Sequence, residues 1–362
     1  ATCCIAFLSG SLGAAAQKKS AAKNVLTQTL KGKSWSADNG NGTFTNPLFY
    51  DEFSDPDIIR VGEDYYLAGT TMHSVPGLVV LHSKDLVNWE FSSYCFDRLD
   101  DSDDFNLRNG KEAYGQGIWA PAIRYHNGKF YIFSNINGHG LQVYISDSAK
   151  GPWTHHKING DIYDLSVLFD EDGKIYAVHK YGNVTVTELK PDLSGPVEGS
   201  SKVVIPEGNA MGEGHHVYKI NGMYYILSAD YSPMGRMQCA RSKSIWGPYE
   251  TCVISERESY GYAAGWSVGN MGIGRPLPED GFNFQNNKPN GLNLGCATIH
   301  QGGIVQAPDG KWWGVSMQDF NAVGRTVCLS PITWVDGWPY FGLEKNLGRS
   351  PRTWFKPNDA VK

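Results

Sequence analysis

A short pattern occurs five times along this chain, and few folds can accommodate it. Each copy opens with one polar or aromatic lead residue, continues through a run of mixed residues and a turn, and ends in a pair that contains an aromatic residue. From the lead residue to the first residue of the pair the interval is 10, 11, 11, 11 and 12 residues. The lead residues are Asp55, Trp119, Asp164, Glu213 and His300, and the pairs begin at Tyr65, Phe130, Ile175, Tyr224 and Trp312.

Turn dipeptides divide these copies into short strands. Asn-Gly or Asp-Gly occurs at 127–128, 172–173, 221–222 and 309–310, between strand-like runs, and this is the strongest local signal for a β-hairpin. No segment after residue 45 keeps the 3.6-residue period of a helix. Five such units in sequence predict an all-β fold, a five-bladed β-propeller. A β-sandwich is the alternative, but it does not explain the constant interval.

The N-terminal region differs from the repeats. Residues 1–16 are mostly apolar and end in three alanines, which is typical of the remainder of a signal peptide, or else of a buried strand. Residues 17–45 form a polar leader, and we expect the propeller to occupy residues 46–362. The signal favours a secreted or periplasmic location. No other stretch approaches the ~18 apolar residues of a membrane span, so no membrane partner is expected.

Charge and cysteine content restrict the function further. The chain of 362 residues has a formal net charge of −5 and no extended basic cluster, so nucleic acid is not an expected partner. The seven cysteines fit no zinc-binding spacing. Cys239 and Cys252 could face each other across neighbouring strands, either as a disulfide or as free thiols.

The innermost strands of a propeller surround one axial funnel, so equivalent lead residues should converge there. Three of the five are carboxylic acids, which favours acid–base chemistry. A single acid at such a position could equally well serve only to cap backbone N–H groups at the strand end. Three acids at equivalent positions make this structural explanation a poor one. Asp57 lies two residues after Asp55 and is a rival to it on the same strand.

The repeats carry motifs that resemble glycoside hydrolase family 43, five-bladed propeller glycosidases that act on xylosides and arabinosides. The matching segments are 54–62, 117–125, 163–173, 213–219, 324–329 and 334–339. The resemblance implies that Asp55 is the general base and Glu213 the general acid. It makes Asp164 the third acid, which raises the pKa of the general acid and orients it. Inverting cleavage needs an acid and a base whose carboxyl groups are ~6.5–9.5 Å apart.

The resemblance also implies residues that bind the sugar. Arg325 matches an arginine that contacts the sugar, and a planar guanidinium can bind two oxygen atoms at once. Trp119 offers an apolar platform for a sugar ring. Met72 and His73 match a loop that forms the pocket wall, although many members have an aromatic residue at the position of Met72. His216 matches the usual histidine of its motif.

A calcium ion is the one cofactor to consider. The resemblance implies that His300 lies on the axis and binds water or Ca²⁺, but calcium prefers oxygen ligands, and a hydrogen-bonded channel histidine is an equal alternative. No cofactor is needed for the chemistry. The acidic segment 97–104 is a solvated loop or, less favourably, a calcium loop. His215 stands where many members have proline, so the backbone beside Glu213 is expected to differ.

These features together predict an inverting exo-glycosidase that releases β-1,4-linked xylose, α-L-arabinofuranose or both from xylan and arabinoxylan oligosaccharides. Loops 70–77 and 269–298 are expected to close one end of the funnel into a pocket, which would limit cleavage to single sugars at chain ends. An open groove would indicate an endo-arabinanase instead. A non-catalytic carbohydrate-binding propeller would keep Trp119 and Arg325 without needing the three acids. The motifs specify neither the preferred sugar nor the oligomeric state.

Overall fold

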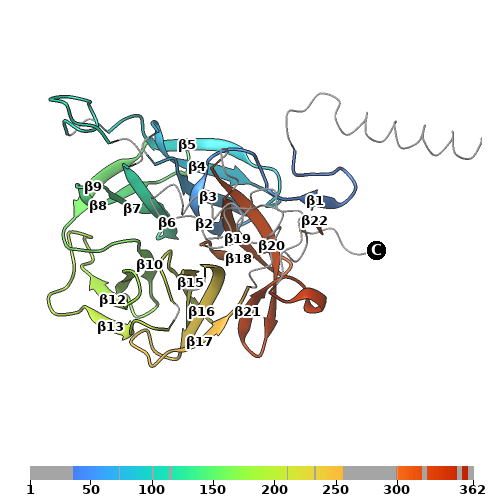
Figure 1. Ribbon diagram of the computed structural model, residues 1–362. Coiled ribbons are helices and arrows are strands. Elements are labelled where there is room, and N and C mark those ends of the chain that lie inside the picture. Colours follow the sequence, from blue (N-terminus) through green and yellow to red (C-terminus); the bar gives the residue numbers. More distant parts are fainter. Residues whose placement is uncertain are drawn as a thin grey trace, which may run out of the picture.

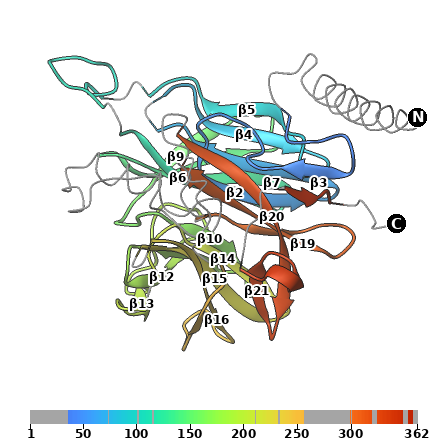
Figure 2. The same ribbon diagram turned by 45° about the vertical axis from the view of Figure 1, so that its right-hand side comes forward.

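The computed structural model of the chain describes residues 36–72, 74–99, 102–113, 116–209, 211–231, 234–255, 299, 301–319, 324–348 and 353–357. Within these ranges the one helical element is the short 3₁₀ helix η3 (Glu344–Asn346), and the regular structure is otherwise β-strand. Five antiparallel sheets of four strands form a ring, as Figures 1 and 2 show from two directions. The predicted all-β, five-bladed propeller is confirmed.

Each blade is built from consecutive strands, listed here from the axis outward. Blade 1 contains β2 (Ser54–Val61), β3 (Asp64–Thr70), β4 (Gly77–Ser83) and β5 (Glu90–Phe96). Blade 2 contains β6 (Ile118–His126), β7 (Lys129–Ile136), β8 (Gly140–Ser146) and β9 (Thr154–Ile158). Blade 3 contains β10 (Ser166–Phe169), β11 (Ile175–His179), β12 (Val184–Leu189) and β13 (Lys202–Ile205). Blade 4 contains β14 (His216–Ile220), β15 (Met223–Tyr231), β16 (Met234–Ser242) and β17 (Glu250–Val253). Blade 5 contains β18 (Ile304–Gln306), β19 (Trp312–Asp319), β20 (Arg325–Val335) and β21 (Trp338–Phe341).

The predicted turns join the first two strands of the blades. Asn127 and Gly128 connect β6 to β7 with φ angles of 48° and 80°, and Asn221 and Gly222 connect β14 to β15 with 50° and 76°. Two successive positive φ angles define a type I′ turn, whose twist matches that of the flanking strands. The Asn-Gly dipeptides therefore fix the register of these hairpins, and with it the distance from each lead residue to the turn.

The buried hydrophobic residues of the described chain form five clusters, one between each pair of neighbouring blades. Between blades 2 and 3, for example, Phe133 and Val143 pack with Val167 and Ala177. Between blades 5 and 1, Val315 and other residues of β19 and β20 pack against β2 and β3. A blade is thus buried on both faces, which explains why its strands contain apolar runs rather than a strict alternation. The inner strands also contact one another around the axis, β2 with β6, β6 with β10, β10 with β14, and β18 with β2.

The ring is closed by the segment that precedes blade 1. The backbone N–H groups of Leu48 and Phe53 donate to the carbonyl oxygens of Val327 and Arg325 on β20, at 2.8 Å each. The buried Asn46 side chain bonds both the N–H and the carbonyl of Leu329. The first residues of the propeller are therefore tied to the last blade.

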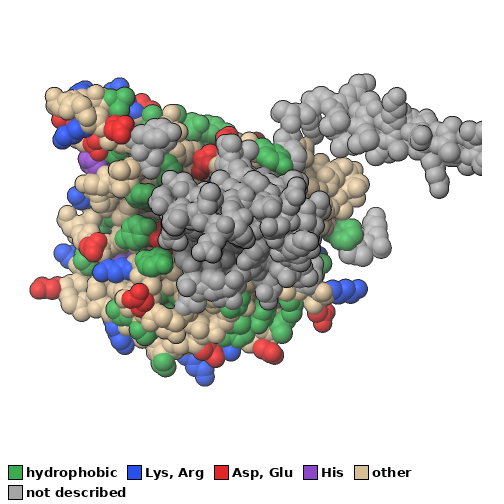
Figure 3. All heavy atoms as spheres, viewed as in Figure 1, with side chains coloured by type: hydrophobic (Ala, Val, Ile, Leu, Met, Phe, Trp, Pro, Cys, Tyr) green, Lys and Arg blue, Asp and Glu red, His purple; other side chains and the backbone are tan. Residues whose placement is uncertain are grey.

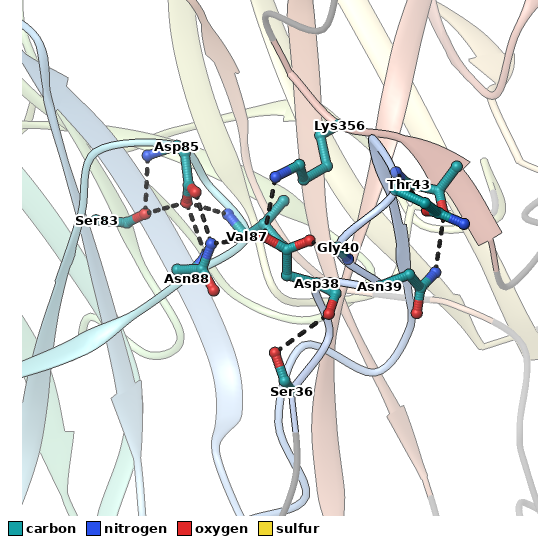
Figure 4. A network of polar contacts seen from close by, with 11 residues as sticks. Ser36, Asp38, Asn39, Gly40, Thr43, Ser83, Asp85, Val87, Asn88 and Lys356 are labelled. Carbon is teal, nitrogen blue, oxygen red and sulfur yellow. Dashed lines mark hydrogen bonds and ion pairs between the residues drawn. The ribbon is translucent and has the colours of Figure 1, made fainter. Parts of the chain in front are cut away.

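A small two-stranded sheet lies beside this closure. It pairs β1 (Thr43–Thr45), which falls in the expected polar leader, with β22 (Thr353–Phe355) near the other end of the chain. Figure 4 shows Asp38 between Lys356, whose ammonium lies 2.9 Å away, and Asn88 of the turn between β4 and β5. Both ends of the described chain are thus anchored to blade 1.

Cys239 on β16 and Cys252 on β17 are direct cross-strand partners, as expected, and both are free thiols. Cys239 is buried, and the Cys252 sulfur lies 3.2 Å from the Tyr340 hydroxyl. Of the two alternatives for this pair, the structure has the free thiols. The described part of the chain also contains no helix of the length and hydrophobicity needed to cross a membrane.

Candidate active site

Two of the lead residues lie in matching β-bulges. In blade 1, Ser54 pairs with Thr70 and Asp57 with Ala68, so Asp55 and the proline after it oppose a single residue of β3. In blade 2 the register shifts in the same way around Trp119. A bulge adds one residue and turns its side chain away from the normal strand direction. The lead residues are therefore structurally equivalent here, as the repeat predicts.

The lead aspartates adopt an unusual backbone conformation. Asp55 and Asp164 have φ angles of 53° and 52°, in the left-handed region that residues other than glycine seldom occupy. The surroundings hold both in place: the Asp55 N–H faces the Met317 sulfur at 3.4 Å, and the Asp164 N–H donates to Asn135 Oδ1 at 3.1 Å. Such conformations are costly and tend to occur at functional sites.

The three lead acids converge on one site. Asp164 is only 5% exposed, and the Gly214 N–H, next to Glu213, donates to its Oδ2 at 2.6 Å. Burial and the negative charges of Glu213 and Asp55 together raise the pKa of Asp164 to about 8, although the Gly214 N–H and the Arg325 charge oppose the rise. Carboxyl groups coupled in this way titrate as a unit, so the site retains a proton near neutral pH.

Arg325 reaches the site because of the ring closure. It begins β20, and its guanidinium Nη1 lies 3.1 Å from Asp55 Oδ1. The Arg325 N–H donates to Glu52 Oε2 at 2.8 Å, and Glu52 also accepts a bond from the Ser54 hydroxyl. Arg325 thus orients the Asp55 carboxylate. Sequence reasoning missed Glu52, since it precedes the first repeat.

Asp57, the rival of Asp55, has a different role. It is fully buried, and its Oδ2 lies 2.5 Å from Arg124 Nη1 and accepts the Ile123 N–H at 2.9 Å. Arg124 Nη2 also donates to the Ser166 hydroxyl, which accepts the Val217 N–H. This axial network links blades 1 to 4. Asp57 is already engaged in it and is not placed to activate water.

The two neighbouring histidines hold the backbone beside Glu213. His216 is buried, bonds the Gly214 carbonyl at 2.9 Å, and lies 3.5 Å from Asp57. His215 bridges the Ser228 hydroxyl and the Lys180 carbonyl, and burial lowers its pKa to about 4, so it is neutral. Both hold the backbone that carries Glu213, and they point to opposite sides of the strand.

The expected sugar-binding residues are only partly described. Trp119 is half-buried at the start of β6, and the Ile118 N–H donates to the Met72 carbonyl at 3.2 Å. This bond brings the 70–72 loop beside Trp119, as a pocket wall requires. His73, His300 and the segment 269–298 lie outside the described residues.

The described residues show no cluster of metal-binding side chains around which a calcium site could be drawn. None of their His, Cys, Asp and Glu side chains forms a group of three that could hold a metal ion. Asp57, a buried carboxylate on β2, is already bonded to Arg124 and to backbone N–H groups. The calcium ion therefore stays a prediction that depends on His300.

Sequence reasoning also overlooked Tyr163. Its hydroxyl lies 3.1 Å from Glu213 Oε2 and donates a hydrogen bond to it. The available signal was an aromatic residue directly before a lead acid.

On the face of the molecule shown in Figure 3, the coloured Lys and Arg side chains are interspersed with Asp and Glu.

The chain was compared with known proteins. The model of glycosyl hydrolases family 43 matches residues 44–261, more than half of the chain. A beta-xylosidase of Formosa agariphila is 30% identical over 95% of this chain and 58% of its own length. A non-reducing end alpha-L-arabinofuranosidase of Bacteroides ovatus is 33% identical over 87% of this chain and 56% of its own length.

Solved structures agree with this. A bifunctional GH43-CE protein of Bacteroides eggerthii superposes with a TM-score of 0.71 at 33% identity, over 87% of this chain and 37% of its own. A GH43 glycoside hydrolase with an engineered active site has a TM-score of 0.69 at 27% identity, over 88% of this chain and 58% of its own. This chain spans a little over half the length of the beta-xylosidase and the alpha-L-arabinofuranosidase named above. With its five blades, its three converging acids and this family match, the chain belongs to glycosyl hydrolases family 43.

Proposed function

We propose that this chain is an inverting, exo-acting glycosidase that removes β-linked xylose or α-L-arabinofuranose from hemicellulose oligosaccharides. One observation carries the proposal: the lead acids Asp55, Asp164 and Glu213 of three different blades meet at one site. Asp164 accepts the Gly214 N–H beside Glu213, and Arg325, which is bonded to Asp55, also acts on Asp164. Asp57 is a separate buried carboxylate, paired with Arg124 in the axial network, and is not one of these three acids.

The geometry suggests a role for each acid. Glu213 is the least buried of the three and acts as general acid, giving a proton to the glycosidic oxygen as its bond to the anomeric carbon breaks. Asp55, oriented by Arg325, takes a proton from a water molecule as the water oxygen bonds to that carbon from the opposite face. Asp164 is buried against the Gly214 N–H and does not touch the sugar; together with Glu213 and Asp55 it keeps one proton in the site near neutral pH.

The sugar and the mode of cleavage follow from the relatives. One is named a beta-xylosidase and another a non-reducing end alpha-L-arabinofuranosidase, so both sugars are proposed as substrates, released from chain ends. No cofactor is proposed for the chemistry.

The test compares wild type with Glu213→Ala on xylobiose, p-nitrophenyl β-xyloside, p-nitrophenyl α-arabinofuranoside and arabinan. The wild type should release single sugars with inverted anomeric configuration, followed by NMR. Glu213→Ala should lose at least ~10²-fold in kcat/KM on xylobiose, because protonation of the leaving oxygen is lost. Glu207→Ala, which removes a nearby exposed glutamate, is the matched control and should behave as wild type.

Other outcomes would replace the proposal. Internal cleavage of arabinan would identify an endo-arabinanase. Binding of xylo-oligosaccharides without turnover of any substrate would identify a carbohydrate-binding propeller. Near-normal turnover of xylobiose by Glu213→Ala would remove Glu213 from the role of general acid.

We also propose that the protein is exported, because residues 1–16 have the composition of a signal peptide. Residues 1–45, preceded by a start methionine, can be fused to a phosphatase that is active only outside the bacterial cytoplasm. An active fusion is expected, and a fusion that stays inactive in the cytoplasm would contradict export.

A further inference from the structure

We infer that Tyr163 is a positioning residue for the general acid: its hydroxyl holds Oε2 of Glu213, so that Oε1 faces the glycosidic oxygen and delivers the proton. The inference rests on the proposed function of Glu213. Nothing in the family match or in the names of the relatives assigns a role to this tyrosine.

The contact joins two neighbouring blades. Tyr163 precedes β10 and Glu213 precedes β14, and their side chains meet at 3.1 Å between the hydroxyl oxygen and Oε2. The backbone around Tyr163 is fixed on both sides, because its carbonyl accepts the Lys180 N–H at 2.9 Å and the next residue, Asp164, bonds Asn135. The Tyr163 side chain is 38% exposed, so it lies at the rim of the site rather than in a core cluster.

The hydroxyl can act only as a donor to Glu213. Burial and the charges of Glu213, Asp164 and Asp55 raise the pKa of Tyr163 well above its ordinary value, so the phenol keeps its proton at neutral pH. Because Oε2 accepts this proton, the transferable proton of the protonated acid sits on Oε1. A glutamate carboxyl otherwise rotates freely about its last bond and presents either oxygen.

Other charged or titratable groups surround the pair and must be considered for any pH effect. They are Asp164 and Asp55, Arg325 beside Asp55, and Lys180 and His215 on the segments packed against Tyr163 and Glu213. His215 is neutral above pH 5 and Arg325 stays charged, so neither changes state between pH 5 and 8. Asp164, with a pKa of about 8, shares the proton of the site with Glu213 in this range, so the pH profile belongs to the pair. Tyr163→Phe leaves all of these groups in place and removes one hydroxyl.

The experiment compares Tyr163→Phe with wild type on two leaving groups. A nitrophenyl group departs as a stable anion and needs little help from the acid, whereas the sugar leaving group of xylobiose needs the proton. Tyr163→Phe should lose about tenfold in kcat on xylobiose, the effect of one hydrogen bond to a charged group, and less than about twofold on p-nitrophenyl β-xyloside. Hydrogen bonding favours the ionised carboxyl, so its loss should move the basic limb of kcat/KM to higher pH.

Tyr176→Phe is the matched control. It lies in the same blade, and its hydroxyl donates to Asp172 at 2.8 Å, outside the site. It should leave the ratio of the two substrates and the pH profile unchanged. An equal loss on both substrates by Tyr163→Phe, or an unchanged ratio and pH profile, would overturn the inference.

Crystal structures of wild type and Tyr163→Phe decide the matter independently of activity. The wild type should show the Tyr163–Glu213 bond, and the variant should show the Glu213 carboxyl rotated or in several conformations. A Glu213 side chain that is identical in both would also overturn the inference. A wild type that cleaves no substrate but keeps this structural difference would refute the proposed glycosidase function and not the positioning contact.

Discussion

Replacing Arg124 with methionine should destabilise the propeller severely, because it leaves a buried carboxylate at the axis without its counter-charge. The side chains of Arg124 and Asp57 are 12% and 1% exposed, and their charged atoms are 2.5 Å apart. Methionine keeps much of the apolar volume of the arginine stem. It removes the bonds to Asp57, the Ser166 hydroxyl and the Val167 carbonyl.

The expected cost follows from burial. Removing one partner of a buried ion pair typically costs about 3–5 kcal/mol, because the remaining charge stays desolvated. The matched control is Lys129→Met in the same blade, whose partner Asp147 is 2.8 Å away but whose side chains are 49% and 83% exposed. An exposed pair of this kind contributes about 0–1 kcal/mol.

Urea unfolding at pH 7, followed by fluorescence, measures both variants on the same scale. Adding Asp57→Asn to Arg124→Met should restore part of the lost stability, since the unpaired charge is then gone. If Arg124→Met and Lys129→Met lowered the free energy of unfolding by the same amount, within about 1 kcal/mol, the buried Arg124–Asp57 pair would contribute no more to stability than an exposed pair. The prediction would then be wrong.

Two further predictions concern the backbone and charge of the site. The raised pKa of Asp164 means that the folded state holds a proton which the unfolded chain releases near pH 4, so stability should fall as pH rises from about 4 to about 8. Asp164→Asn should flatten this dependence of Tm on pH, and an unchanged slope would refute the raised pKa. Gly214 has a φ of 67°, and a Cβ there would overlap the Gln301 side chain, so Gly214→Ala should lower both Tm and activity. Gly199→Ala, at a φ of 71° with open space around it, should lower Tm less and leave activity intact. Equal decreases in Tm for the two variants would show that the overlap with Gln301 has no effect.

Much of the fold was predictable because it depends on local and periodic signals. The constant interval after the lead residues requires equivalent hairpins, and the Asn-Gly dipeptides at 127–128 and 221–222 specify their turns. Blades that are apolar on both faces must pack against a neighbour on each side. A closed ring of five blades buries all of these faces. Asp55, Asp164 and Glu213 then converge because they hold equivalent positions at the start of the innermost strands of their blades.

The contacts that distinguish one residue from another were decided only by the tertiary structure. Asp55 and Asp57 are near neighbours in the sequence, yet one meets Arg325 and the other is neutralised by Arg124. Arg325 arrives at Asp55 because the segment before blade 1 binds β20, and Tyr163 meets Glu213 across a blade boundary. A sequence repeat determines where the strands of each blade begin and where the chain turns between them. Which side chain meets which depends on how the blades pack, because those partners come from non-equivalent positions far apart in the chain.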